Sequence, residues 1–466
     1  MRAMPVPRDR RRRPARGRRP ALRLRALSAL ALSLLLAAGG AAVGPARALP
    51  PTARPPSAAA PAGPAPAAAA APAAACGAPY RIEQRLSGGT VWRMCWSYES
   101  HAGLVLKDVT YQPRGEPRPI KVLTSAKLAQ IHVPYDDGSV EYDDLTGQGF
   151  AQGLQQLDPA ECPGGTIKTV RVRGASEPSR ENVAGLCATT RARGHAYRMV
   201  GTDAGEVHQV QDRDLLVYTV NLVGWYEYIT EWRFSSDGTM TMQVGATGSL
   251  SPIDYDAGDG RGWPLGRGAG DYATSHSHNV FWRLNFGLDG SSKSVVEQYD
   301  STTTQESGRL PRTRTTRTRV TRELAGDAVG TRWWRVVSTA GRNADGHPRS
   351  YEIVPGRTTR YQGRPYTRHD VYVTEYRGCE QFASHNLRDC GARAGRSVDT
   401  WVDGQTLEHP VVWVHIGFHH IARDEDQQPM PVHWQGFQLA PRDVTAMNPL
   451  TPPALASHNG HTEAER

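Results

Sequence analysis

The body of this 466-residue sequence lacks the positive charge that its formal net charge of +9 suggests. Residues 1–75 contain thirteen arginines and one acidic residue, Asp9, so the rest of the chain carries about −3. A nearly neutral body excludes the electrostatic attraction on which nucleic-acid binding depends, and we expect no nucleic-acid partner. One basic stretch remains, Arg309–Arg322, where Arg and Thr nearly alternate. We expect it to be a solvated edge strand or hairpin.

The sequence is also poor in helical periodicity, and we expect only one short helix, around Gly149–Leu157. Runs of β-branched and aromatic residues recur instead, separated by Asp-Gly and other glycine-rich breaks. No repeat or linker interrupts residues 76–455, so we expect one domain there and a disordered tail over 456–466. The pattern predicts a mainly β protein, a large antiparallel β-sandwich. The clearest runs are Gly103–Tyr111, Lys168–Val172, Trp333–Ser338, Asp370–Tyr376 and Pro410–Ile416.

The first 48 residues have the pattern of a signal peptide. Arginines crowd Arg8–Arg25, an Ala/Leu-rich apolar stretch covers Ala26–Val43, and small residues predict cleavage after Ala48. Residues 49–75 are almost entirely Ala and Pro, which predicts an extended tether with nothing to bury. We therefore expect a secreted, extracellular protein with no membrane anchor after cleavage. The pattern leaves open whether Sec or twin-arginine export is used.

Cysteine is scarce, and none of the six cysteines forms a CxxC pair. All six follow the tether, in a part of the chain that export would place in an oxidising compartment. Three sequential disulfides are the simplest of the fifteen possible connectivities, and a zinc site is the less favoured alternative. The sequential pairs are 76–95, 162–187 and 379–390.

An apolar and aromatic run, Thr219–Phe234, precedes an Asp-Gly turn and a second β-prone run. This pattern predicts a hairpin with two largely buried strands. On the first strand Tyr226 and Tyr228 share one face, and Trp225 and Glu227 share the other. Taken alone, a buried tyrosine pair is most simply core packing with satisfied hydroxyl groups.

Two histidines, His276 and His278, are spaced so that a strand would direct both to one side. Both imidazoles could then reach a single metal ion, but such a pair is weak evidence without a third ligand. Candidates for that ligand are His415, His419 and His420, and strand alternation leaves open which of them face inward. Three imidazoles without a thiolate suit copper(II) or zinc.

At this point the sequence resembles the copper-containing amine oxidases, the primary-amine oxidases that carry topaquinone. The resemblance covers roughly residues 80–452, and many short blocks match in order with similar spacing. The matching blocks are Gly103–Tyr111, Val133–Tyr135, Tyr142–Asp143, Val223–Tyr228, Gly245–Gly248, His276–His278, Arg283–Leu284, Asp289–Gly290, Ser294–Glu297, His420–Asp426, Pro429–Pro431, Gly436–Phe437 and Asn448–Pro449.

The resemblance implies a role for individual residues. Tyr226 matches the tyrosine that the family converts to topaquinone, using copper(II) and dioxygen. Asp143 matches the catalytic base, and Tyr135 matches the tyrosine that hydrogen-bonds the cofactor oxygen. His420 is preferred to His419 because it directly precedes an Ile-Ala-Arg triplet like that of the family. The implied copper ligands are His276, His278 and His420.

The implied activity is oxidative deamination of a primary amine by dioxygen, which yields an aldehyde, ammonia and hydrogen peroxide. A catalytic carboxylate must remove the substrate α-proton, so Asp143 would need a pKa raised by burial. The resemblance also implies a homodimer, and it places Cys162 and Cys187 where the family has a disulfide. The identity of the amine stays open.

The sequence departs from the family in front of the cofactor tyrosine, where Trp225 replaces an asparagine that orients the ring. A bulky indole could slow cofactor formation, change substrate choice, or mark a catalytically silent copper-binding relative. A plain extracellular β-sandwich adhesion module is a third, weaker reading. Asn285, Gly287 and His409 also replace acidic residues of the family's peripheral calcium-type site, which predicts that this site is absent.

Overall fold

The computed structural model describes residues 76–173, 180–201, 205–252, 262–267, 271–305, 307–385, 390 and 395–452. All of them belong to one compact unit, Ala68–Arg466. The predicted signal peptide (1–48), tether (49–75) and tail (456–466) lie outside the described residues. Within the described part of the chain, no helix has the length and apolarity needed to cross a membrane.

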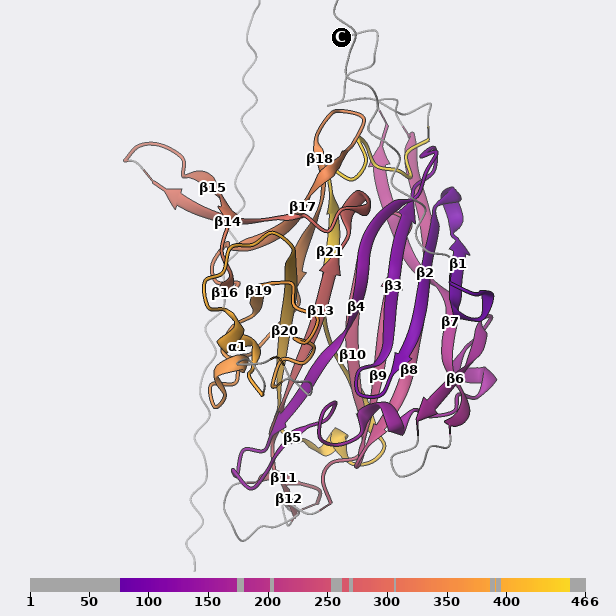
Figure 1. Ribbon diagram of the computed structural model, residues 1–466, viewed down its shortest axis with the longest axis vertical. Helices are drawn as coiled ribbons and strands as arrows, with labels where there is room; N and C mark the ends of the chain where they lie inside the picture. The colour runs from indigo at the N-terminus through magenta and orange to yellow at the C-terminus, as the bar shows by residue number, and fades with distance from the viewer. Residues whose placement is uncertain are drawn as a thin grey trace, which may run out of the picture. The chain divides into compact units, whose positions relative to one another are not determined.

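The described residues form two large antiparallel sheets that pack face to face, as predicted (Figure 1). The first sheet contains the two strands that carry the candidate histidines, β13 and β20, near its middle. Its order is β1 (Arg81–Arg85), β2 (Val91–Glu99), β3 (Gly103–Gln112), β4 (Ile120–Pro134), β13 (His276–Phe286), β20 (Pro410–His420), β19 (Val371–Glu375) and β16 (Leu324–Gly326), with β5 (Glu141–Asp143) paired to β4.

The second sheet contains the strand that carries Tyr226. Its order is β15 (Arg312–Val320), β14 (Val295–Thr304), β17 (Trp333–Arg342), β18 (Pro348–Pro355), β21 (Met430–Arg442), β10 (Met240–Gly248), β9 (Tyr226–Phe234), β8 (Val207–Val223), β7 (Arg180–Val200) and β6 (Thr166–Arg173). A small third sheet pairs β11 (Trp263–Leu265) with β12 (Asp271–Ala273). The β14–β15 hairpin projects from the sandwich, and β15 is an exposed edge strand, as the Arg/Thr alternation predicts (Figure 1).

The main hydrophobic core lies between the two sheets and draws on nearly every long strand. Trp232 of β9 packs against Trp282 of β13, with ring centroids 4.9 Å apart. Tyr226 and His276 lie six residues earlier on the same two strands. Because strand side chains alternate, they point into the same space between the sheets. The core packing therefore sets β9 opposite β13 at the candidate site.

A second core covers the outer face of the first sheet, where Tyr366 of the turn η6 (Pro365–Thr367) and Trp401 of the helix α1 (Val398–Trp401) pack over Phe281 and Trp413. The central strands are thus buried on both faces, which explains their continuous apolar runs. The described helices are short: α1 (Val398–Trp401) and the 3₁₀ turns η1 (Ala78–Tyr80), η2 (Ser87–Gly89), η3 (Phe150–Gly153), η4 (Pro159–Glu161), η5 (Leu288–Gly290), η6 (Pro365–Thr367) and η8 (Asp424–Asp426). The expected helix at Gly149–Leu157 is only the turn η3.

The predicted single strand Thr219–Phe234 is wrong, because the run contains a hairpin turn. Strand β8 ends at Val223, which pairs with Tyr226 at the start of β9. Gly224 has φ of 59°, and this left-handed conformation allows a tight two-residue turn. The turn is hidden in the sequence because apolar residues flank it on both sides. Tyr226 consequently stands at the very beginning of its strand.

The three sequential disulfides are confirmed. Their Cα atoms lie 5.7–5.9 Å apart, within the range that a disulfide spans without backbone movement. No free cysteine occurs among the described residues, which leaves no thiolate there for a zinc site. The pairs are Cys76–Cys95, Cys162–Cys187 and Cys379–Cys390.

Candidate metal centre

Three imidazoles meet at one end of the space between the sheets. His276 and His278 lie on the same face of β13, and His420, the last residue of β20, pairs with His276 in the strand ladder. All three side chains are buried, with at most 2% of their surface exposed. Nε2 of His276 lies 3.0 Å from Nε2 of His278. The structure therefore brings together the three predicted ligands, with donor atoms close enough to hold one ion.

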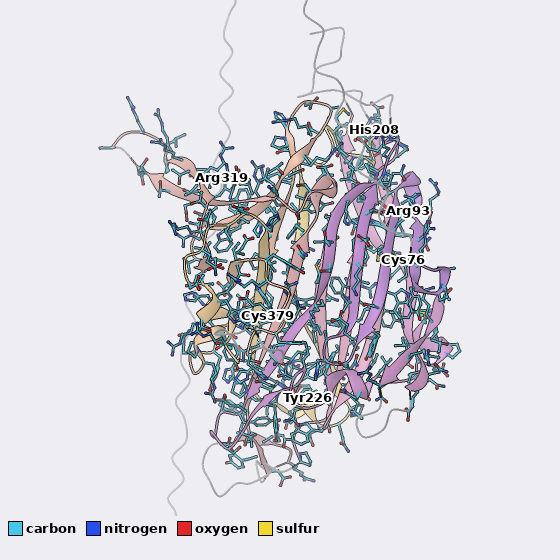
Figure 2. All side chains as sticks on the ribbon, in the orientation of Figure 1. Cys76, Arg93, His208, Tyr226, Arg319 and Cys379 are labelled. Atoms are coloured by element: carbon cyan, nitrogen blue, oxygen red, sulfur yellow. A yellow bond between two sulfur atoms is a disulfide. The ribbon has the colours of Figure 1, made fainter. Side chains whose placement is uncertain are left out.

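The phenol of Tyr226 points into this histidine cluster, near the lower end of the sandwich in Figure 2. Its oxygen lies 2.7 Å from Nε2 of His276 and 3.1 Å from Nδ1 of His420. Tyr228 stacks on Tyr226 with ring centroids 5.9 Å apart, so the two tyrosines share a face as predicted. The hydroxyl of Tyr228 lies 3.3 Å from Nδ1 of His278. Tyr228 therefore does more than pack, a contact that the sequence pattern did not indicate.

Burial keeps the three imidazoles uncharged. Desolvation, with a smaller contribution from neighbouring His420, lowers the pKa of His276 to about 3. Desolvation also holds the pKa of His278 well below its usual value and lowers that of His420. Neutral imidazoles have the free lone pairs that metal binding requires. Three such nitrogens beside a phenol oxygen fit copper(II) or zinc by donor type.

The two other candidate histidines lie outside the cluster. Nε2 of His415 contacts the side-chain oxygen of Asn279 at 3.1 Å, and its ring stacks on Phe281 in the outer core. His419 is exposed, and its Nε2 lies 2.9 Å from a carboxylate oxygen of Asp136. The choice of His420 over His419 thus agrees with the direction of the side chains.

Tyr135 and Trp225 form one wall of the site. The ring of Tyr135 stacks on His276 with centroids 4.9 Å apart. The indole Nε1–H of Trp225 donates a hydrogen bond of 3.2 Å to the hydroxyl of Tyr135. Trp225 also meets Tyr142 edge-on, at 6.3 Å between ring centroids. The residue that departs from the family pattern is therefore tied to a predicted cofactor partner.

The side chains of the consecutive residues Asp143 and Asp144 contact different neighbours. The predicted base, Asp143, is half-buried and accepts a hydrogen bond of 2.9 Å from Nδ1 of His132. Asp144 is buried and hydrogen-bonds to Tyr228, which stacks on Tyr226. Desolvation raises the pKa of Asp144 to about 7. Of the pair, Asp144 is thus the carboxylate held against the tyrosine stack, and the Asp-Asp doublet was its only sequence signal.

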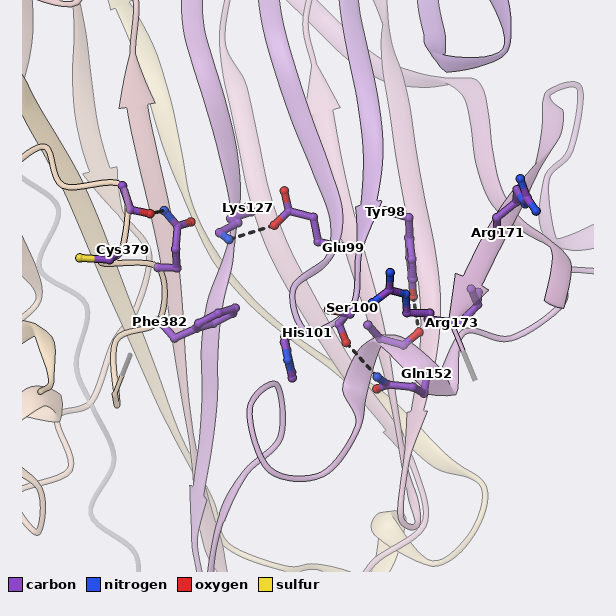
Figure 3. A pocket seen from close by; sticks show the side chains of 14 residues that line it. Tyr98, Glu99, Ser100, His101, Lys127, Gln152, Arg171, Arg173, Cys379 and Phe382 are labelled. Carbon is purple, nitrogen blue, oxygen red and sulfur yellow. Dashed lines mark hydrogen bonds and ion pairs between the residues drawn. The ribbon is translucent and has the colours of Figure 1, made fainter. Parts of the chain in front are cut away.

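A cavity of about 820 Å³ lies elsewhere, between β2, β4, β6 and the loop around Cys379 (Figure 3). None of the histidines of the metal centre lines it. Its most buried charged group, Lys127, makes an ion pair of 3.1 Å with Glu99 and lies over the ring of Phe382. His101, Arg171 and Arg173 also line the cavity. The cavity therefore does not coincide with the histidine cluster.

The fold and the site together define a β-sandwich protein with a buried three-imidazole metal centre that adjoins a tyrosine. A sequence model described as copper amine oxidase, enzyme domain, matches residues 87–456. The chain therefore belongs to the copper amine oxidase family.

Two curated relatives show distant similarity to this chain. The chain is 25% identical over 414 residues to copper-containing amine oxidase alpha 2, peroxisomal, of Arabidopsis thaliana, covering 80% of this chain and 60% of that protein. It is 28% identical over 431 residues to histamine oxidase of Arthrobacter globiformis, covering 84% and 60%. This chain thus spans about three fifths of the length of these relatives.

The fold is also that of a solved copper amine oxidase. A copper-containing benzylamine oxidase from Hansenula polymorpha superimposes with a TM-score of 0.68 at 21% identity. The match covers 78% of this chain and 62% of that one. At this identity the likeness establishes the architecture, and the function rests on the residues of the site.

Proposed function

We propose that this chain is a secreted primary-amine oxidase that uses copper(II) and a topaquinone derived from Tyr226. One observation carries the proposal: the Tyr226 oxygen lies 2.7 Å from Nε2 of His276 and 3.1 Å from Nδ1 of His420. When bound, copper(II) and the quinone made from Tyr226 would supply redox chemistry with dioxygen and a carbonyl for the amine. His276, His278 and His420 would hold the copper.

The chain's own residues would orient the ring and exclude water. Stacking on Tyr228 from one side limits rotation of the Tyr226 ring, and the whole cluster is buried. Tyr135, whose hydroxyl receives the Trp225 indole N–H, stands on the face of His276. Fixed rings in a dry site favour a single productive geometry.

A carboxylate must take the α-proton of the amine. Asp143 is the residue that the resemblance predicts, but its hydrogen bond to His132 directs it away from the tyrosine stack. We propose Asp144 for this step, because it touches Tyr228 and has a pKa of about 7. A carboxyl group that titrates near neutral pH can both accept and return a proton.

Mass analysis of the Tyr226 peptide tests the proposal directly. The copper-free protein is incubated with copper(II) in air, stained for quinone and digested. We expect the Tyr226 peptide to gain two oxygens and lose two hydrogens, and the Tyr226→Phe variant to gain nothing. Because Tyr228 lies in the same peptide, fragmentation should place the added oxygens on Tyr226 and leave Tyr228, stacked on it, unmodified. An unmodified Tyr226 after full copper loading would disprove the proposal.

A second candidate function, copper binding without amine oxidation, rests on Trp225. The indole stands in the turn directly before Tyr226 and contacts Tyr135 and Tyr142. If this wall blocks ring reorientation, the chain would bind copper without oxidising amines. One copper per chain with no hydrogen peroxide from any primary amine would favour this silent relative. Recovery of quinone formation in Trp225→Asn would identify the indole as the cause.

Secretion and dimerisation complete the proposal. The Arg-rich, Ala/Leu-rich and small-residue segments of residues 1–48 support export, and cleavage after Ala48 would be visible by N-terminal sequencing of protein from the medium. We propose a homodimer because the family resemblance implies one. Light scattering of the purified protein should give twice the mass of one chain, and a single-chain mass would contradict the dimer.

A further inference from the structure

A histidine–aspartate–histidine network lies behind the metal centre. Asp426 ends the turn η8, just after β20, and its side chain is fully buried. One of its oxygens, Oδ2, lies 2.8 Å from Nε2 of His420. The other, Oδ1, lies 3.0 Å from Nε2 of His433 on β21. The backbone N–H of Arg423 also donates to Oδ2, at 3.1 Å.

These contacts determine which nitrogen of His420 faces the cluster. A carboxylate only accepts hydrogen bonds, so His420 must donate from Nε2 and carries its proton there. The lone pair is then on Nδ1, the atom that lies 3.1 Å from the Tyr226 oxygen. An imidazole without this partner could present either tautomer. His433 donates to the opposite oxygen, which prevents the carboxylate from turning away.

We propose that Asp426 and His433 are positioning residues for the copper centre. Asp426 selects the tautomer of His420 that offers Nδ1 to the metal, and His433 fixes the orientation of Asp426. The inference rests on the proposed copper site. It concerns two residues that do not touch the metal themselves.

The same three side chains could in principle hold a second cation, because their donor atoms lie close together. Arg423 disfavours this reading. Its Nε lies 3.5 Å from Oδ1 of Asp426, and its Nη2 lies 3.5 Å from Nε2 of His433. A guanidinium at this position already balances the carboxylate and repels a further positive charge. A second ion would also require His420 to give up its Nε2 proton.

The test compares copper-free full-length wild type with Asp426→Asn, His433→Gln and a control, His419→Gln. His419 is exposed and adjoins His420 but contacts Asp136 instead of the network. Competition with a chelator gives the affinity for copper(II), and electron paramagnetic resonance of the loaded proteins reports its ligand geometry. We expect about 10- to 100-fold weaker binding for Asp426→Asn, a smaller loss for His433→Gln and none for the control.

The resonance spectrum separates positioning from a merely structural role. At saturating copper, Asp426→Asn should show altered nitrogen hyperfine structure, whereas a variant that is only less stable would keep the wild-type spectrum. Wild-type affinity and spectrum in both variants would overturn the inference while leaving the copper site intact. Uptake of two metal ions by the wild type, with one lost in His433→Gln, would overturn it in favour of a second site. A wild type that binds no copper would overturn the proposed function and this inference together.

Discussion

The metal centre and the cavity of Figure 3 are two polar regions of one sandwich that differ in burial, in charge and in open volume. At the metal centre, the three histidines are buried and uncharged, and their donor atoms lie within 4.8 Å of one another. The cavity encloses about 820 Å³, but its charged side chains pair with each other or reach towards solvent. Convergent, desolvated donor atoms mark the reactive region here, and empty volume does not.

The largest effect should follow from removing a ligand. His276→Ala deletes the nitrogen nearest to both Tyr226 and His278, and we expect copper binding to weaken by more than about 100-fold, beyond the usual effect of an outer partner. Metal content measured by mass spectrometry checks this expectation. The exposed neighbour His419→Ala should keep one copper per chain. Full copper loading of His276→Ala would place the metal elsewhere.

The second prediction concerns the two consecutive carboxylates of the reactive region. Asp144→Asn should lower kcat/KM for a primary amine by about 10²- to 10⁴-fold, because a general base is lost. Asp143→Asn, which weakens the contacts of this side chain with His132 and His385, should lower it by less than about tenfold. Peroxide production by fully copper-loaded variants provides the measurement. The opposite order would restore Asp143 as the base.

The third prediction is a pH dependence of stability. The folded pKa of Asp144, about 7, lies above the usual value of an aspartate, 3.8, so between these two pH values the folded protein binds more protons than the unfolded chain. The contribution of Asp144 to stability should therefore fall as pH rises from about 4 to 7, by up to about 4 kcal/mol. The buried histidines, whose folded pKa values are lowered, contribute in the opposite direction, so the contribution of Asp144 is read from the difference between the wild type and Asp144→Asn. Urea unfolding of the copper-free protein across this range measures the slope. In Asp144→Asn this contribution should disappear, and an unchanged slope there would refute the assignment.

The smallest effects should come from the cavity. Glu99→Gln leaves the buried Lys127 ammonium without a carboxylate and should cost about 1–3 kcal/mol of stability. Lys127→Met removes the charge itself and should cost less than Glu99→Gln. Both variants should keep wild-type copper content and amine oxidation within about twofold. A larger loss of activity in either one would show that the cavity takes part in the reaction.

The fold class, the three disulfides and the shared strand face of His276 and His278 could be predicted from the sequence. Each depends on a local pattern or on spacing that a strand preserves, whereas His420 was identified as the third ligand only through the resemblance to the family. Residue patterns did not predict the features that depend on tertiary contacts. The turn at Gly224 is hidden because buried residues surround it, and β20 is apolar on both faces, so alternation could not assign His420 to the cluster.

The sequence also could not show which of two adjacent residues faces the site. Asp143 and Asp144 are neighbours in the sequence, yet one faces His132 and the other Tyr228. Neither composition nor spacing distinguishes them, so the sequence could not show which of the two lies against the tyrosine stack. The network of Asp426 and His433 was missed for a related reason. Its members become partners only when the chain turns after β20 and returns as β21.

The three parts of the centre come from strands far apart in the sequence. Tyr226 and His276 are separated by 50 residues, and Tyr226 and His420 by 194. Contacts of such long range are slow to form, because the cost of closing long loops must be met before they are made. A chain still being synthesised therefore has the tyrosine long before it has the last imidazole. The order of the strands along the chain thus delays assembly of the site, because Tyr226 cannot contact all three histidines until His420 has been synthesised.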